Sequence, residues 1–220
     1  MPAPATRTVS TALAAALLCA AAANFLATVD AAGDIVSTAC ANETAHYYRP
    51  PGLSQWFCEF ALRSDNRSAA AGHPRDLAFV ALDLVEAGAA DAAAKVVGAL
   101  RSGGAARRSK DLALSLRYCR LDYEAVVRTV PVCRGLVDEY DPFVEGHNRG
   151  DLLLYVYLEC ADRMKNAAYN CWAHLKPIDE VKKKDVWKEV NEAASRAILA
   201  KAMIAQMIGI VEEDDKDCDD

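Results

Sequence analysis

A seven-residue spacing of apolar side chains runs through residues 112–140. Two sets of positions alternate along it, and they are Leu112, Cys119, Val126, Cys133 and Tyr140 at the first seam position and Leu116, Tyr123, Val130 and Val137 at the second. A repeat of this kind over four heptads is typical of a helix that packs along one side. Pro131 lies inside the repeat and removes one backbone hydrogen bond, so we expect a bend there.

Residues 152–175 repeat the pattern and predict a second helix. Its seam positions are Leu153, Tyr157, Cys160, Met164, Ala167, Cys171 and His174. The segment between the two helices, residues 141–150, is rich in Asp, Gly, Asn and Pro and therefore predicts a loop. A short loop between two amphipathic helices produces an antiparallel hairpin.

Two further helices are predicted on either side of this hairpin. The first covers about 75–100, has its apolar side at Leu77, Val80, Leu84, Val85 and Val96, and ends at Ser102-Gly103-Gly104. The second covers about 181–211 and carries Val186, Val190, Ala193, Ala197, Ala200, Ile204 and Met207 at spacings of four and three. Four such helices predict an all-α fold, an antiparallel four-helix bundle.

Residues 34–64 are too short and too interrupted to form a core of their own. A Cys40–Cys58 bridge would close this segment and restrict its unfolded chain, which stabilises the fold by a few kcal/mol. We therefore expect a disulfide-stapled N-terminal helical hairpin that packs against the bundle.

The four cysteines of the long hairpin lie on its seams, so their pairing follows from geometry. In an antiparallel helix pair, bonded residues have a nearly constant sum of residue numbers. Pairing Cys119 with Cys171 and Cys133 with Cys160 gives sums of 290 and 293, whereas the crossed pairing gives 279 and 304. The mismatch of three residues corresponds to about 4.5 Å of helix rise. We expect Cys119–Cys171 and Cys133–Cys160.

Composition places the chain among globular proteins. It has 220 residues, of which 53% are hydrophobic and 25% charged, and its 11 glycines and 8 prolines are too few for a collagen-like or low-complexity chain. The net charge of −6 argues against a nucleic-acid-binding protein. Seven acids and one lysine in residues 212–220 account for that charge, and they predict an acidic disordered tail.

Residues 1–32 have the features of a signal peptide. Arg7 supplies the positive charge, the apolar run from Leu13 to Ala23 is shorter than the roughly 20 residues that span a bilayer, and small residues follow it. We expect a secreted protein whose bundle domain covers 33–211, with no membrane association after cleavage. The destination is then extracellular, in the cell wall, or vacuolar.

Export makes disulfides the first interpretation of the cysteines. Cys171 and His174 form a C-x-x-H motif without a partner pair at zinc-ribbon spacing, so no metal site is expected. Cys218 has no predicted partner; we expect a monomer, with a dimer through Cys218 as the alternative. Asn42 and Asn66 begin glycosylation sequons and should be exposed.

No catalytic motif is present in the sequence. It contains no G-x-S-x-G, no H-E-x-x-H and no glycine-rich phosphate loop, and its four histidines lie far apart without ligand spacing. These observations predict a protein that is not an enzyme and that needs no cofactor.

Several segments in order along the chain resemble the plant invertase and pectin methylesterase inhibitor family, in particular the invertase inhibitors of the pollen-allergen type. The segments that carry this resemblance are Ile35-Val36-Ser37-Thr38-Ala39-Cys40, Phe57-Cys58, Leu62-Arg63-Ser64-Asp65, Asp76-Leu77-Ala78, the L-x-x-C-x-x-x-Y motif of Leu116, Cys119 and Tyr123, Cys171 with Leu175, and the alanine-rich run from Asn191 to Met203. Cys133, Cys160 and Cys218 lie outside the four-cysteine pattern. Cys160 matches the fourth family cysteine by spacing, but the residues after Cys171 fit better.

The resemblance implies a secreted inhibitor that binds a target enzyme, acid invertase (β-fructofuranosidase) or pectin methylesterase. Invertase inhibitors of the family insert a Pro-Lys-Phe segment into the target's cleft, and here Pro142 and Phe143 stand at that place without the lysine. In the pectin methylesterase branch the helix faces bind instead. His147 lies near this loop and would make binding depend on pH.

A second functional hypothesis comes from a different class of protein. A secreted helical bundle can carry a small apolar ligand between its helices, and Tyr118, Tyr155 and Trp172 are the residues that would line such a cavity.

Overall fold

The computed structural model describes residues 35–42, 51–102, 109–141, 152–182 and 185–210, and these residues form helices and connecting turns only. The elements, in chain order, are a helical stretch at 35–42, α2 (Gln55–Arg63), the 3₁₀ helix η1 (Asn66–Ala70), α3 (Pro74–Ser102), α4 (Lys110–Glu139), α5 (Leu152–Leu175), α6 (Asp179–Lys182) and α7 (Asp185–Met207). The predicted signal peptide, the acidic tail and Cys218 lie outside the described residues.

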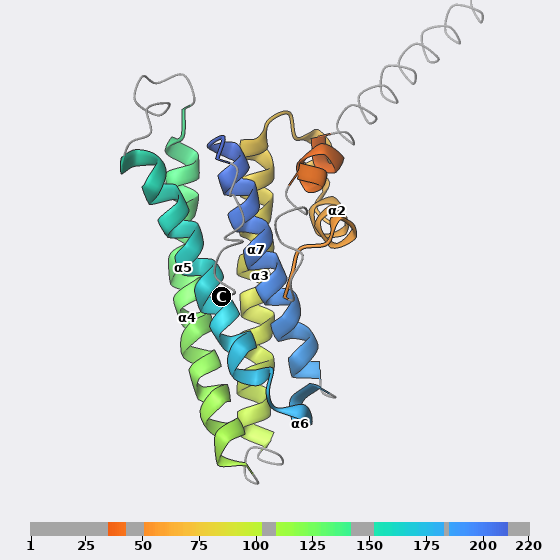
Figure 1. Ribbon diagram of the computed structural model, residues 1–220, viewed down its shortest axis with the longest axis vertical. Helices are drawn as coiled ribbons and strands as arrows, with labels where there is room; N and C mark the ends of the chain where they lie inside the picture. Colours follow the sequence, from red (N-terminus) through yellow and green to blue (C-terminus); the bar gives the residue numbers. More distant parts are fainter. Residues whose placement is uncertain (1–34, 43–50, 103–108, 142–151, 183–184, 211–220) are drawn as a thin grey trace, which may run out of the picture.

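The four long helices form the expected antiparallel bundle. α3 packs against α4 and α7 (Figure 1). α5 also packs against α4 and α7, and this closes the ring of four helices. The helical stretch at 35–42, α2 and η1 lie to one side, beside α3 (Figure 1). The prediction of an all-α bundle with a stapled N-terminal hairpin is therefore confirmed.

The seam predicted for α4 is buried along its whole length. Each of its nine residues is at most 8% exposed, and Pro131 lies on the opposite, solvent-exposed side within a helix that continues to Glu139. Ser109 accepts a hydrogen bond from the Leu112 amide at 3.2 Å, which starts the helix. The seven-residue repeat thus locates both the helix and its buried side.

The seam predicted for α5 is correct at first and then drifts. Tyr157, Cys160, Met164 and Cys171 are buried, but Ala167 is only half-buried. His174 is exposed, and Leu175 takes the core position instead. A straight helix has 3.6 residues per turn, so a strict seven-residue pattern rotates away from the core by about 20° per heptad. The placement of His174 on the seam was wrong for this reason.

The last predicted helix, 181–211, differs from the structure at both ends. Val181 belongs to the short α6, and α7 begins at Asp185. Its end is set by Gly209, which has φ +73° and occupies the left-handed region that glycine favours. The Ile210 amide donates to the Ala205 carbonyl at 3.0 Å and the Gly209 amide to Gln206 at 3.1 Å, which is a Schellman C-cap.

α7 is the most deeply enclosed helix of the bundle. Between Ala193 and Ala205 every residue except Arg196 is buried, Lys201 included. The Lys201 ammonium group forms an ion pair with Asp162 of α5 at 2.8 Å, and Lys165 approaches the same carboxylate at 3.2 Å. The charged group is thus accommodated inside the bundle by a partner on the neighbouring helix.

The N-terminal hairpin is joined internally by a covalent bond and by polar contacts. A Cys40–Cys58 disulfide joins the helical stretch 35–42 to α2, with the Cα atoms 5.7 Å apart. The hydroxyl of Ser68 in η1 is buried and donates to the Leu62 carbonyl at 2.6 Å. These bonds fold η1 back against α2.

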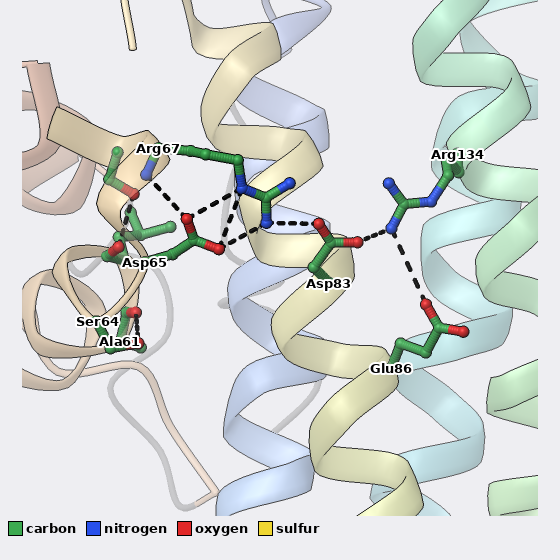
Figure 2. A network of polar contacts seen from close by, with 9 residues as sticks. Ala61, Ser64, Asp65, Arg67, Asp83, Glu86 and Arg134 are labelled. Atoms are coloured by element: carbon green, nitrogen blue, oxygen red, sulfur yellow. Dashed lines mark hydrogen bonds and ion pairs between the residues drawn. The ribbon is translucent and has the colours of Figure 1, made fainter. Parts of the chain in front are cut away.

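A chain of ion pairs connects this hairpin to the bundle (Figure 2). The Arg67 guanidinium of η1 bonds Asp65 and Asp83, both at 2.6 Å, and Asp83 lies on α3. Asp83 also pairs with Arg134 of α4, which approaches Glu86 at 4.0 Å. A single carboxylate on α3 therefore holds arginines from two other elements.

Two disulfides join α4 to α5. Cys119 pairs with Cys171 and Cys133 with Cys160, with Cα–Cα distances of 4.4 and 5.6 Å. This is the pairing expected from the seam geometry. Within the part of the chain that the structure describes, no helix is both long and apolar enough to cross a membrane.

Candidate functional site

Four large apolar side chains are exposed along one side of α4. Leu114, Tyr118, Leu121 and Val132 are 46–60% exposed. Their spacings of four, seven and eighteen residues from Leu114 place them on the same side of an α-helix. We name these four residues the α4 stripe.

Arginines are interleaved with the α4 stripe. Arg117 lies three residues after Leu114, and Arg128 lies four residues before Val132, so both fall within one turn of stripe residues. Arg128 donates from Nε to the Glu124 carbonyl oxygen at 3.1 Å. This acceptor is neutral, so the contact does not compensate the charge of the guanidinium group. The side of α4 that carries the stripe is therefore apolar and basic.

Tyr118 of the α4 stripe contacts α5 by ring stacking, and the neighbouring residue Cys119 is bonded to α5 by a disulfide. The His174 ring of α5 stacks on the Tyr118 ring with centroids 5.3 Å apart and planes 26° from parallel. Tyr118 directly precedes Cys119, whose bond to Cys171 fixes the spacing of the two helices at this level. The outer face of the α4–α5 hairpin is thus held in one geometry.

Two polar groups lie inside this face without hydrogen-bond partners. Oδ2 of Asp122, one turn beyond Tyr118, is buried, and so is the hydroxyl of Tyr123. Burial raises the pKa of Asp122, against a smaller lowering by the His174 charge. Burial likewise raises the pKa of Tyr123, with a further contribution from Asp122. The Asp122 carboxyl group therefore lies in an environment that disfavours its ionised form.

The residues predicted for the functional loop are not placed by the structure. Pro142, Phe143 and His147 lie outside the described residues, and the chain is described up to Asp141. Both predicted sequon asparagines, Asn42 and Asn66, are described and are exposed.

The three aromatic residues predicted to line an apolar cavity do not come together. Tyr118 and Tyr155 are 46% and 62% exposed, on the outer sides of their helices. Trp172 is buried and donates from Nε1 to the Asn191 side chain at 3.1 Å, with the Trp187 ring stacked against it. This prediction was wrong, because Tyr118 and Tyr155 lie outside the buried seams of their helices and face solvent.

Clefts lie at both ends of the bundle. One, of about 330 Å³, lies at the end of the bundle where α3, α4, α6 and α7 meet and includes Leu116 and Val186. The other, of about 680 Å³, lies at the opposite end. There, Arg75 donates to the Val137 carbonyl at 2.9 Å and so caps the end of α4. No group of three or more His, Cys, Asp or Glu side chains in the described part of the chain is arranged to hold a metal ion.

Sequence reasoning missed the proximity of Asp122 and His174. Assigning His174 to the buried seam removed it from the candidate surface residues, and Asp122 carries no motif. A 3.6-residue period applied from Tyr157 onward would have placed His174 at the edge of the helix that faces α4.

Comparison with known proteins yields a likeness in structure alone. No protein-family model and no curated protein sequence matches this chain. Its structure is similar to that of a mutant form of a pectin methylesterase inhibitor from Arabidopsis, with a TM-score of 0.58 and 16% sequence identity, over 78% of this chain and 96% of that chain. The two chains share a fold.

Proposed function

We propose that this chain is a secreted, non-catalytic protein inhibitor that binds and blocks a carbohydrate-active enzyme, either acid invertase or pectin methylesterase. The shared fold with a pectin methylesterase inhibitor supports this proposal, as do the family-like segments of the sequence. The three disulfides favour an oxidising compartment, consistent with export to the cell wall or the vacuole. The protein acts as a monomer unless Cys218 links two copies.

The observation that carries the proposal is the exposed α4 stripe with its arginines. A large exposed apolar strip on a folded protein marks a place where another protein binds. The basic residues Arg117 and Arg128 fit an acidic partner, and enzymes that cleave glycosidic bonds hold pairs of carboxylates at their clefts. Because two disulfides fix α4 against α5, little conformational entropy is lost when this face docks.

The predicted loop offers a second mode of contact for an invertase target. Pro142 and Phe143 would present one aromatic side chain at the far end of α4. They follow Glu139, the last residue of α4, which lies 21 residues beyond Tyr118, and this separation corresponds to about 32 Å of helix rise. The two modes therefore use surfaces that can be altered independently.

An inhibition titration tests the proposal directly. We expect the mature protein, added near pH 5, to abolish the activity of acid invertase or of pectin methylesterase at a stoichiometric dose. Tyr118→Ser combined with Leu121→Ser should weaken inhibition by tenfold or more, because truncating central apolar anchors costs above 1 kcal/mol each. Phe143→Ala should have that effect instead if the loop is the contact.

Tyr155→Ser provides the matched control for this experiment. Tyr155 is 62% exposed, yet it lies near the start of α5, away from the level at which His174 meets Tyr118. This variant should inhibit as the unaltered protein does. Full activity of both enzymes at excess inhibitor would refute the proposed function.

A further inference from the structure

Two aromatic side chains project into solvent from α2. Trp56 is 72% exposed and Phe60 is 60% exposed, and they lie one helical turn apart. Their rings stack in nearly parallel planes, 9° apart, with 5.2 Å between the ring centroids. The stack holds the indole ring in one orientation while most of its surface stays open to solvent. Contiguous aromatic surface that is left in water marks a place where a ligand binds.

A row of polar side chains runs beside the two rings. Gln55, Glu59 and Arg63 follow one another at intervals of four residues, on the neighbouring side of the same helix. Gln55 donates from Nε2 to Oε1 of Glu59 at 3.0 Å, and Arg63 donates from Nη2 to Oε2 of Glu59 at 3.4 Å. Arg63 also donates from Nη2 to the Ser37 hydroxyl at 2.8 Å. This polar row therefore offers positioned donors and acceptors next to an apolar surface.

The charges of the polar row cancel. Glu59 and Arg63 carry opposite charges and form an ion pair, and Gln55 is neutral. A phosphate backbone or an anionic membrane surface requires clustered lysines and arginines, whereas Arg63 is the single basic residue of α2. The balance of charge on this side of α2 therefore favours a neutral ligand.

The size of the aromatic surface favours a small ligand over a protein partner. Complete burial of two aromatic side chains removes at most about 500 Å² from water. A stable protein–protein interface takes about 800 Å² from each partner. The nine residues of α2 also extend over only about 14 Å. This surface is therefore too small to hold a second copy of the chain.

We propose that the outer side of α2 binds a neutral saccharide, with a pyranose ring stacked on Trp56 and its hydroxyl groups bonded to the polar row. A pyranose ring has an apolar C–H face and a rim of hydroxyl groups that donate and accept hydrogen bonds. It therefore matches an aromatic ring that is bordered by an amide, a carboxylate and a guanidinium group. Phe60 is a positioning residue, because its ring holds the indole in place before the saccharide binds.

The saccharide site is separate from the proposed inhibitory contact. α2 packs beside α3, on a different part of the molecule from the α4 stripe (Figure 1). The two surfaces can therefore be occupied at the same time. The saccharide site can also be tested without any enzyme, so its failure and the failure of the proposed function are distinguishable.

Calorimetric titration of the mature protein with cellohexaose and with xylohexaose tests the site. We expect one of these neutral probes to bind, and the tryptophan emission to shift to shorter wavelength as the exposed indole is covered. Trp56→Ala should weaken binding by about tenfold or more, because it removes the central apolar anchor. Phe60→Ala should weaken binding less, and Phe60→Tyr, which keeps the ring, should bind as the unaltered protein does. Tyr155→Ser, which alters an equally exposed aromatic residue on α5, should also leave binding unchanged.

Three outcomes would overturn the saccharide site. The first is that neither neutral probe binds, or that binding survives Trp56→Ala. The second is tighter binding of hexagalacturonate, an acidic probe of the same length, which would contradict the selection by charge. The third is self-association in analytical ultracentrifugation that Trp56→Ala abolishes, which would show that this surface joins two copies of the chain.

Discussion

Two aspartates of the bundle occupy opposite electrostatic environments. Asp122 on α4 is half-buried with one oxygen unpartnered, and burial raises its pKa above the ordinary value of 3.8. Burial also raises the pKa of Asp162 on α5, but bonds and charges from Lys201 and Lys165 outweigh it, and the net pKa lies below 3.8. The first carboxyl group favours the protonated form in the fold and the second favours the ionised form.

These opposite shifts predict opposite effects of the same substitution. A raised pKa contributes stability that is present below pH 3.8 and is lost as the pH rises through the folded value. Asp122→Asn should therefore stabilise the protein at pH 7, by about 0.5 kcal/mol, and have no such effect at pH 3.

Asp162→Asn is the matched variant with the reverse sign. A lowered pKa contributes stability above pH 3.8 that is lost as the pH falls through the folded value. This variant should lose about 1–2 kcal/mol at pH 7, because a largely buried lysine loses its ionised partner, and the loss should shrink below pH 3.5. Urea unfolding of both variants at pH 3 and 7 measures the effects, and equal signs at pH 7 would contradict this account.

At the scale of the helix, α4 tolerates a proline in its last third. Pro131 lies on the exposed side, so the carbonyl that loses its amide partner, that of Val127, belongs to a residue that is 40% exposed. Water is therefore available to that side of the helix. The position of Pro131 on this side explains why the core seam through Val130 and Cys133 continues past it.

Replacing this proline should stabilise the protein. Pro131→Ala restores an amide and removes the clash of the ring with the preceding turn, so the free energy of unfolding should rise by about 1–3 kcal/mol. Thermal unfolding provides the measurement. An unchanged or lower Tm would show that the proline relieves a strain elsewhere in the hairpin.

The same helices show what the sequence could predict. In α4 the repeat is regular enough that all nine seam residues proved buried, and the sums of cysteine positions matched the bonded pairs. In α5 the seam failed at His174, because a seven-residue repeat read over three heptads accumulates the difference between 3.5 and 3.6 residues per turn. The end of α7 was overextended to residue 211 because the alanine-rich pattern hid the cap at Gly209.

The candidate site was less predictable than the fold. The α4 stripe consists of apolar residues that lie outside the seven-residue repeat, so the sequence pattern does not single them out. The stripe is recognised only from the exposed fractions of its side chains. Asp122 and His174 are 52 residues apart in sequence, and only the register set by the adjacent disulfide brings them together. The predicted contacts Pro142 and Phe143 remain predictions.

Across the described residues, disulfides and ion pairs link the helices of the fold to one another. Three disulfides join helices in pairs, and Asp83 on α3 links η1 to α4 through Arg67 and Arg134 (Figure 2). Exposed ion pairs contribute little individually, but shared carboxylates form networks that position elements relative to one another. The disulfides therefore provide most of the stability that these links add.

Removing one bundle disulfide should be costly. Replacing both Cys119 and Cys171 with alanine opens a crosslink that spans 52 residues, which corresponds to about 4 kcal/mol in the loop-entropy model. The Cys133–Cys160 pair spans 27 residues and should contribute slightly less. Denaturant unfolding of the two double variants, with free thiols counted by mass spectrometry, checks the order; reduced thiols at Cys119 and Cys171 in the unaltered protein would contradict the scheme.

The enclosed hydroxyl of Ser68 has a consequence for biosynthesis. Asn66 faces solvent, but the third residue of its sequon is bonded to the Leu62 carbonyl inside the hairpin. A glycosylating enzyme recognises the acceptor through that hydroxyl as well as the asparagine. We therefore expect any oligosaccharide on Asn66 to be transferred to the nascent chain, before the Ser68 hydroxyl is enclosed, so that the fraction of molecules carrying one would report how fast this part of the protein folds.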